Sequence, residues 1–265
     1  ARGMDLVTIT DHDSIGGCLE LLDRCGELPD FVMGEEVSAC LPQFQHTIHV
    51  AVYGHTEAQH REIQRLRPNG AELVAYLRSC DLLFVLNHFF HDFSNPARLR
   101  EFIEQMAAWF DIFEVRNGTM QREHNKFIVD LLERYRHRRR PISMVAGSDS
   151  HTLRRIGRSF TASAARSREE FLGDIRAGRT QVFGPHSNHL TLAADIYGVV
   201  LRYYPMVLSV RNGEFSPLAR IQKFFLSVAA APLLFTPYVA AVRHSAIERS
   251  RIHQYSRLYF GGQPS

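Results

Sequence analysis

Residues 6–13 read Leu-Val-Thr-Ile-Thr-Asp-His-Asp, a short apolar and β-branched run that ends in a cluster of ionisable side chains. The run predicts a buried strand over Leu6–Thr10, and Ser14 predicts the N-cap of a helix over Ser14–Cys25. The same order of apolar run, polar cluster and helical periodicity recurs along residues 1–185. Such alternation is typical of βα units around a parallel sheet.

The other runs of residues 1–185 predict further strands and helices of the same kind. The expected strands are Phe31–Met33, Thr47–Tyr53, Leu82–Leu86, Ile112–Val115, Ile142–Ala146 and Gln181–Phe183. The expected helices are Gly70–Cys80, Pro96–Ala108, Met120–Arg138 and Ser167–Ala177, the last with Ser167 as its N-cap.

Polar clusters follow most of these strands. They are Thr10-Asp11-His12-Asp13, Gly34-Glu35-Glu36-Val37-Ser38, Asn87-His88, Glu114-Val115-Arg116-Asn117-Gly118 and Gly147-Ser148-Asp149-Ser150-His151, and His49 lies inside the third strand segment. In an open α/β sheet or a (β/α) barrel the strand ends share one rim, where such folds place their active sites. We therefore expect these carboxylates and imidazoles to converge in space.

The residue types of these clusters favour a metal site. The chain has fourteen histidines, and Glu, Asp and His without Cys form an oxygen and nitrogen ligand set that suits Zn, Mn or Fe. Two cations held about 3.5–4 Å apart can activate water and clamp a phosphoryl group. The residues alone leave open whether Glu35 or Glu36, and whether His88 or His91, is the functional member of each pair.

In their order and spacing these motifs resemble the PHP family, named for polymerase and histidinol phosphatase, over residues 1–185. The resemblance implies a distorted (β/α)7 TIM-like barrel with a di- or trinuclear metal site at the C-terminal rim. The family begins with a strand that ends in His-x-His and a helix. Only Ala1-Arg2-Gly3 precedes Met4 here, so we expect a barrel that lacks its first strand and helix.

The resemblance also implies roles for individual residues. The expected metal ligands are His12, Glu36, His49, His88, Asp149 and His151. Glu36 would be the bridging carboxylate, and Asp11, His12 and Asp149 would form the catalytic centre. The family usually has Pro after the ligand at His88, where this chain has Phe89, so His91 stays its competitor. Arg158 and Asn117 are the candidate substrate-binding residues.

The implied activity is hydrolysis of phosphate esters by a metal-activated water, with two or three divalent ions (Mn, Zn or Fe) as cofactors. The substrate would be a phosphorylated small molecule, a nucleotide or an oligonucleotide. A non-catalytic PHP module that binds metal or phosphate as a scaffold is the alternative. An amidohydrolase-type metal barrel is a third possibility, because it shares the same rim.

Charge and hydropathy divide the chain near Pro185. Residues 1–185 carry 23 basic and 25 acidic side chains, whereas residues 186–265 carry 8 and 3 and are expected to form a basic, helical C-terminal appendage. Residues 224–242 lack charge, which raises the possibility of membrane association.

The four cysteines form no disulfide framework, which favours a reducing, cytoplasmic setting. No oligomeric state is indicated.

Overall fold

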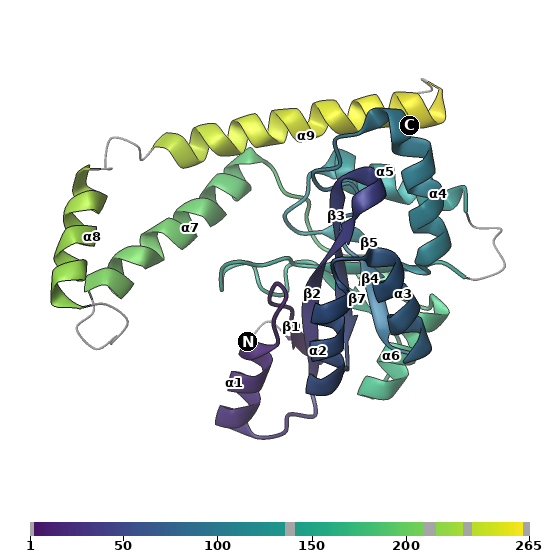
Figure 1. Ribbon diagram of the computed structural model, residues 1–265, viewed down its shortest axis with the longest axis horizontal. Coiled ribbons are helices and arrows are strands. Elements are labelled where there is room, and N and C mark those ends of the chain that lie inside the picture. Colours follow the sequence, from purple (N-terminus) through teal and green to yellow (C-terminus); the bar gives the residue numbers. More distant parts are fainter. Residues whose placement is uncertain (1–2, 136–140, 209–215, 230–234, 262–265) are drawn as a thin grey trace.

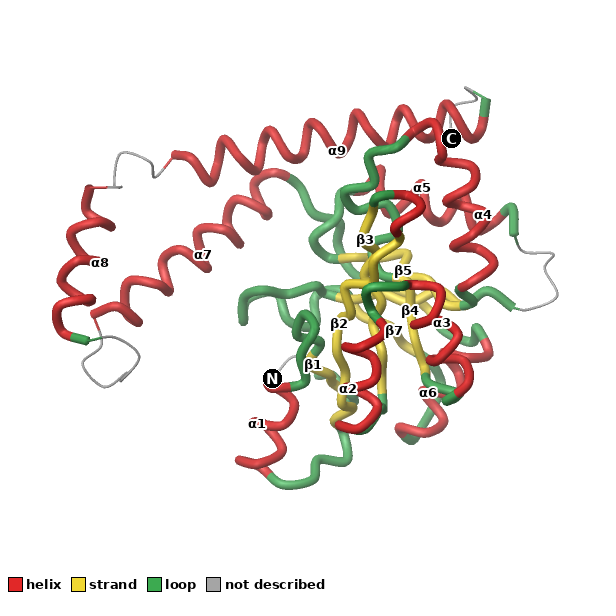
Figure 2. Tube along the Cα trace, viewed as in Figure 1, coloured by secondary structure: helices red, strands yellow, loops and turns green. Residues whose placement is uncertain are grey.

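The computed structural model describes residues 3–135, 141–208, 216–229 and 235–261. It is a mixed α/β fold around a curled, half-barrel sheet, with helices outside it (Figures 1 and 2). The sheet has six strands in sequence order: β1 (Val7–Ile9), β2 (Phe31–Leu41), β3 (His46–Tyr53), β4 (Leu83–Leu86), β5 (Ile112–Asn117) and β6 (Ser143–Gly147). The strands predicted from the sequence are thus present, with shifted ends.

The expectation of a parallel sheet throughout is wrong for the middle of the sheet. β3 is antiparallel to both β2 and β4, and only the outer pairs β1–β2, β4–β5 and β5–β6 are parallel. The reason is that β2 runs on to Leu41 and turns back through a 3-10 turn, Pro42–Phe44, followed by Gln45 in a left-handed conformation with φ of 50°. A tight connection of this kind can join only antiparallel strands.

Helices cover the outside of the sheet. They are α1 (Gly16–Cys25), α2 (Glu57–Leu66), α3 (Gly70–Ser79), α4 (Leu99–Trp109, after a 3-10 turn at Pro96–Arg98), α5 (Arg122–Glu133) and α6 (Arg168–Ala177). Ser167 caps α6 as predicted, whereas α1 starts at Gly16 and Ser14 only accepts a hydrogen bond from the Gly16 amide. The helix predicted over Met120–Arg138 is shorter in the structure, where α5 ends at Glu133; residues 136–138 lie outside the described residues.

Two elements were not predicted from the sequence. Helix α2 begins with a complete capping box between Thr56 and Gln59, a signal that the sequence does contain. Strand β7 (Phe160–Ala162) pairs only with β8 (Gln181–Phe183), and a three-residue strand carries too little pattern to be recognised.

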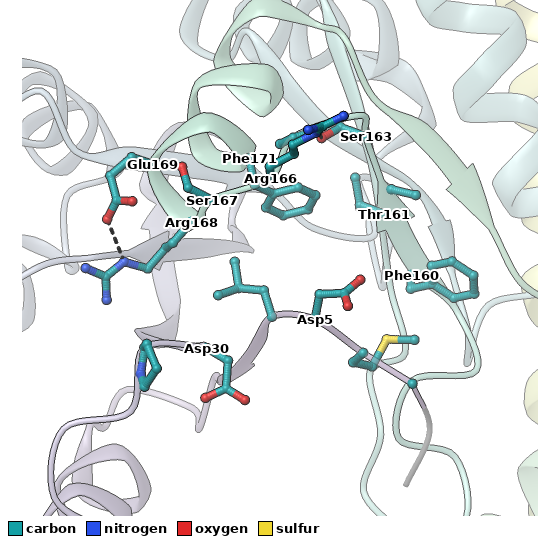
Figure 3. A pocket seen from close by; sticks show the side chains of 16 residues that line it. Asp5, Asp30, Phe160, Thr161, Ser163, Arg166, Ser167, Arg168, Glu169 and Phe171 are labelled. Carbon is teal, nitrogen blue, oxygen red and sulfur yellow. Dashed lines mark hydrogen bonds and ion pairs between the residues drawn. The ribbon is translucent and has the colours of Figure 1, made fainter.

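The described strands do not close into a ring, so the distorted (β/α)7 barrel is not confirmed. β1 and β6 are the two ends of the six-stranded sheet. Between the segment before β1 and the β7–α6 region lies a pocket of about 750 Å³, where Asp5 and Asp30 lie on one side and Phe160 and Thr161 on the other (Figure 3). The curled sheet is thus open on this side.

The C-terminal part is helical, as expected, and comprises α7 (His189–Leu208), α8 (Pro217–Ala229) and α9 (Thr236–Phe260). Figure 1 shows α7 and α8 extending away from the sheet and α9 running back across the top of the molecule. α9 joins the main core, because Ile252 and Tyr255 are buried in the same apolar cluster as Phe90 and Phe93. The Tyr255 hydroxyl donates a hydrogen bond to the carbonyl of Phe93.

The uncharged stretch 224–242 is split between elements. Residues up to Ala229 belong to α8, residues from Thr236 belong to α9, and 230–234 lie outside the described residues. In the part of the chain that the structure describes, no helix combines the length and the apolar character that a membrane span requires. Membrane association through this stretch stays a prediction.

The packing of Tyr255 generates a stability prediction. Replacing Tyr255, whose exposed fraction is 1%, with alanine should lower the free energy of unfolding by about 3 kcal/mol, because a buried ring is lost. Tyr255→Phe should cost only about 1 kcal/mol, the worth of one hydrogen bond. Urea unfolding followed by circular dichroism measures both values. A loss below 1 kcal/mol for Tyr255→Ala would show that α9 is not part of the core.

Candidate metal centre

A buried carboxylate, Glu36 on β2, lies among three imidazoles. Its Oε1 is 3.0 Å from His88 Nε2 and 3.5 Å from His49 Nδ1, and its Oε2 is 3.7 Å from His12 Nε2. The Asn87 side-chain amide also donates to Oε1 at 3.0 Å. The structure therefore brings together four of the six residues expected as metal ligands.

Each imidazole reaches Glu36 because of its place in the sheet. His12 follows β1 and forms a single parallel bridge with Glu36, which places the His12 side chain next to β2. His49 is paired with Ser38 across the β2–β3 ladder and shares the face of Glu36, since side chains two residues apart point the same way. His88 directly follows Asn87 at the end of β4, with φ of 25°.

The negative charge of Glu36 stabilises positively charged groups next to it. Burial opposes ionisation of Glu36, yet the hydrogen bonds from His49 and His88 hold its pKa far below the usual range. Burial likewise opposes the charged form of His88, but the hydrogen bond and charge of Glu36 outweigh it and raise the pKa of His88 to about 9. A divalent cation would satisfy the same negative charge, and the donor set suits Zn, Mn or Fe.

A second polar network lies next to this centre at the ends of β5 and β6. The Asn117 side-chain amide donates to Glu114 Oε2 at 2.9 Å and to Asp149 Oδ2 at 3.2 Å. The Thr119 hydroxyl lies 2.7 Å from Asp149 Oδ2 as well. Asn117, with an exposed fraction of 1%, thus orients the carboxylate of Asp149, one of the predicted metal ligands. Its side-chain oxygen also accepts a hydrogen bond from the Thr119 amide and so stabilises the turn after β5.

Glu114 connects the two networks. Its Oε2 accepts a hydrogen bond from the backbone amide of His88 at 3.0 Å. Burial, helped by the nearby charge of Asp149 and opposed by that of His88, raises the pKa of Glu114 to about 7. A carboxyl group with such a pKa can hold or release a proton near neutral pH.

The two networks line one cavity of about 420 Å³. Its polar wall is formed by His12, Glu36, His49, His88, His91, Thr119, Asp149 and His151. The rest of its lining is Met120, the α7 residues Leu192, Asp195, Ile196, Val199 and Val200, and His244 on α9. The volume is in the range of small-molecule sites.

An ion pair between the buried Arg155 and the half-buried Asp195 holds α7 beside this cavity. Arg155 Nη1 lies 3.0 Å from Asp195 Oδ2, and the same guanidinium donates to the carbonyl of Gly118. Arg155 is thereby a positioning residue that fixes α7 to the loop after β5. The sequence did not predict this contact, because Asp195 lies in residues 186–265, which were expected to form an appendage to the first 185 residues.

The structure shows where both members of the pairs Glu35/Glu36 and His88/His91 lie. Glu36, and not Glu35, faces the imidazoles, because the two side chains point to opposite faces of β2. Glu35 pairs instead with His55 and His60. His88 contacts Glu36, whereas His91 lines the same cavity but has its Nε2 3.3 Å from Asp92 Oδ2.

Three predicted site residues that the structure describes, Asp11, Arg158 and His151, form no side-chain hydrogen bond or ion pair with Glu36. The Asp11 carboxylate lies against Gly17 at the start of α1 and does not line the cavity. Arg158 is exposed and does not line it either, so its contact with substrate stays a prediction. His151 lines the cavity from an exposed position, with Nδ1 3.2 Å from the carbonyl of Asp149.

The comparison with known proteins points to the same family as the motifs. Residues 132–180, which include Asp149 and His151, match a protein family described as PHP-associated, and this match confirms the resemblance to the PHP family in this segment. No curated protein matches the chain.

Two solved structures are similar to this chain at low identity. One is an amidohydrolase from Chromobacterium violaceum, with 16% identity and a TM-score of 0.40 over 67% of this chain and 87% of that one. The other, from Bifidobacterium adolescentis, is provisionally assigned as a metal-dependent phosphoesterase, with 15% identity and a TM-score of 0.40 over 57% of this chain and 78% of that one.

The position of Glu114 generates a prediction at Gly147. A Cβ at Gly147 would lie 2.6 Å from Glu114 Oε1, so Gly147→Ala should displace this carboxylate and remove the acceptor of the His88 amide. We expect the free energy of unfolding to fall by about 1–3 kcal/mol, as for other overpacked sites.

Gly173→Ala is the matched control, because nothing lies within 4 Å of a Cβ there and the residue is inside α6. This variant should be neutral or more stable by up to about 1 kcal/mol. Urea unfolding compares the two variants, and equal effects would contradict the assigned position of Glu114.

Proposed function

We propose that this chain is a metal-dependent hydrolase of phosphate esters whose reaction centre is the cavity around Glu36. The observation that carries the proposal is the convergence of His12, His49 and His88 on that one buried carboxylate. The proposal includes the distorted (β/α)7 barrel, of which the curled sheet would be a part.

His12, Glu36, His49 and His88 would hold one part of the metal centre, and Asp149 with His151 would hold the other. Two or three divalent ions, Mn, Zn or Fe, are proposed. When bound, such ions supply Lewis acidity and water activation, the chemistry that phosphate ester hydrolysis needs. The His and carboxylate donors fit these ions, and the negative charge that raises the pKa of His88 gives the site its affinity for cations.

The chain's own residues perform the remaining tasks. Asn117 and Thr119 fix the Asp149 carboxylate through hydrogen bonds of 3.2 and 2.7 Å, so that the carboxylate is oriented before substrate arrives. Glu114, with a pKa of about 7, can take up or release a proton at neutral pH.

The cavity suggests which kind of ester fits. Besides its polar residues, the cavity is lined by four apolar side chains of α7, Leu192, Ile196, Val199 and Val200, next to Asp195, which pairs with Arg155. We propose that the phosphoryl group lies against the imidazoles and that an apolar or planar organic group lies against α7. A volume of about 420 Å³ accommodates a small phosphorylated molecule or a nucleotide.

Activity assays with a panel of esters and amides test the proposal. p-Nitrophenyl phosphate, bis-p-nitrophenyl phosphate, a mononucleotide and an acyl amide are incubated with the protein and Mn²⁺, Zn²⁺ or Fe²⁺. We expect hydrolysis of at least one phosphate ester and none of the amide. Cleavage of the amide alone would favour the amidohydrolase alternative.

Variants link this activity to the centre. His12→Ala and Asp149→Ala should each lower kcat/KM by about 100-fold or more, since each removes a ligand expected to orient the reacting groups. His253→Ala, at an exposed position of α9, is the matched control and should leave kcat/KM unchanged. Unchanged activity in both centre variants, with the fold intact by circular dichroism, would overturn the proposal.

A further inference from the structure

A second cluster of metal-binding side chains lies on the opposite face of β2 from Glu36. Glu35 Oε1 is 3.0 Å from His55 Nε2, and Glu35 Oε2 is 2.9 Å from His60 Nδ1. One donor atom from each of these residues lies within 4.8 Å of the others. The cluster shares no residue with the centre around Glu36, and none of its members has a role in the proposed reaction.

Three separate elements bring these side chains together. Glu35 lies on β2, His55 in the short connection after β3, and His60 in the first turns of α2. The capping box at Thr56 fixes the start of α2, which places His60 over the strand. Gln64, one turn further along α2, donates from Nε2 to Glu35 Oε2 at 2.9 Å.

Two members of the cluster are buried, and three of their polar atoms have no hydrogen-bond partner. Glu35 is 0% exposed and His55 3% exposed. Glu35 Oε1 and both ring nitrogens of His55 have no hydrogen-bond partner, since the 3.0 Å approach of His55 Nε2 to Glu35 lacks hydrogen-bond alignment. A buried polar atom without a partner is unfavourable, so a ligand that binds these atoms would be favoured.

The spacing and chemistry of the cluster fit one kind of ligand. Tetrahedral ligands placed about 2 Å from a zinc ion lie about 3.3 Å from one another, close to the separations of the Glu35 oxygens from the two rings. Two imidazoles and a carboxylate are zinc ligands, whereas magnesium and calcium prefer oxygen alone.

We propose that Glu35, His55 and His60 form a second metal site that binds zinc and ties α2 to β2. Gln64 is placed to complete the coordination through its amide oxygen, because the two ends of an amide can exchange by rotation. His60, with 19% of its side chain exposed, gives the ion its path of entry. The site is structural, since Glu35 and His55 are closed off from solvent.

The experiment removes the first centre and then counts zinc. In a His12→Ala/His49→Ala background, purified protein is equilibrated with Zn²⁺, passed over a desalting column and analysed by mass spectrometry for bound metal. We expect about one zinc per chain. Adding His60→Ala should remove that zinc and weaken Zn²⁺ binding by about 100-fold or more.

Glu35→Gln provides a second variant that keeps the side-chain volume, and His253→Ala is the control that should retain the zinc. Cobalt substitution adds a spectroscopic readout, because a tetrahedral site with two imidazoles gives strong visible absorption that His60→Ala should abolish. The proposal is overturned if the background protein binds no zinc, or binds the same amount with and without His60. Neither outcome depends on whether the cavity around Glu36 hydrolyses phosphate esters.

Discussion

The buried charge of Glu36 is the constraint on which the arrangement of the rim depends. A carboxylate that is 6% exposed is tolerated only with cationic or hydrogen-bonding partners, and here they arrive from three different strands. His12 follows β1, His49 lies on β3 and Asn87-His88 follows β4. The site therefore depends on the register of the sheet. A slip of β2 by one residue would put Glu35 in the place of Glu36 and turn the Glu36 carboxylate away from the imidazoles.

The C-terminal helices complete this centre. α7 supplies four apolar side chains to the lining of the cavity and is fixed by the Arg155–Asp195 ion pair. α9 adds His244 and anchors itself in the core through Tyr255. On the same helix, Glu248 accepts a hydrogen bond from His124 Nδ1 at 2.7 Å, with both groups buried. Residues that the sequence placed in an appendage are thus part of the walls around the candidate reaction centre.

The sequence predicted the members of the centre better than the topology. Polar clusters in and after apolar runs pointed to His12 and to the pairs Glu35/Glu36 and His88/His91, and the resemblance to the PHP family selected Glu36 and His88 from those pairs. The antiparallel course of β3 was missed, since Glu35 and Glu36 interrupt the apolar run of β2 and hide its length. The orientation of Asp11 toward Gly17 depends on one turn, and the contact of α9 with α5 joins residues 124 apart; neither leaves a local pattern.

We propose that Glu36 and its imidazoles bind a divalent metal. The experiment is a crystal structure grown with Zn²⁺ or Mn²⁺, with diffraction data collected on both sides of the metal absorption edge. We expect an anomalous peak about 2 Å from a carboxylate oxygen of Glu36 and from ring nitrogens of the surrounding histidines. An ordered structure with Glu36 still in contact with His88 and no anomalous peak beside it would show that these residues hold no metal.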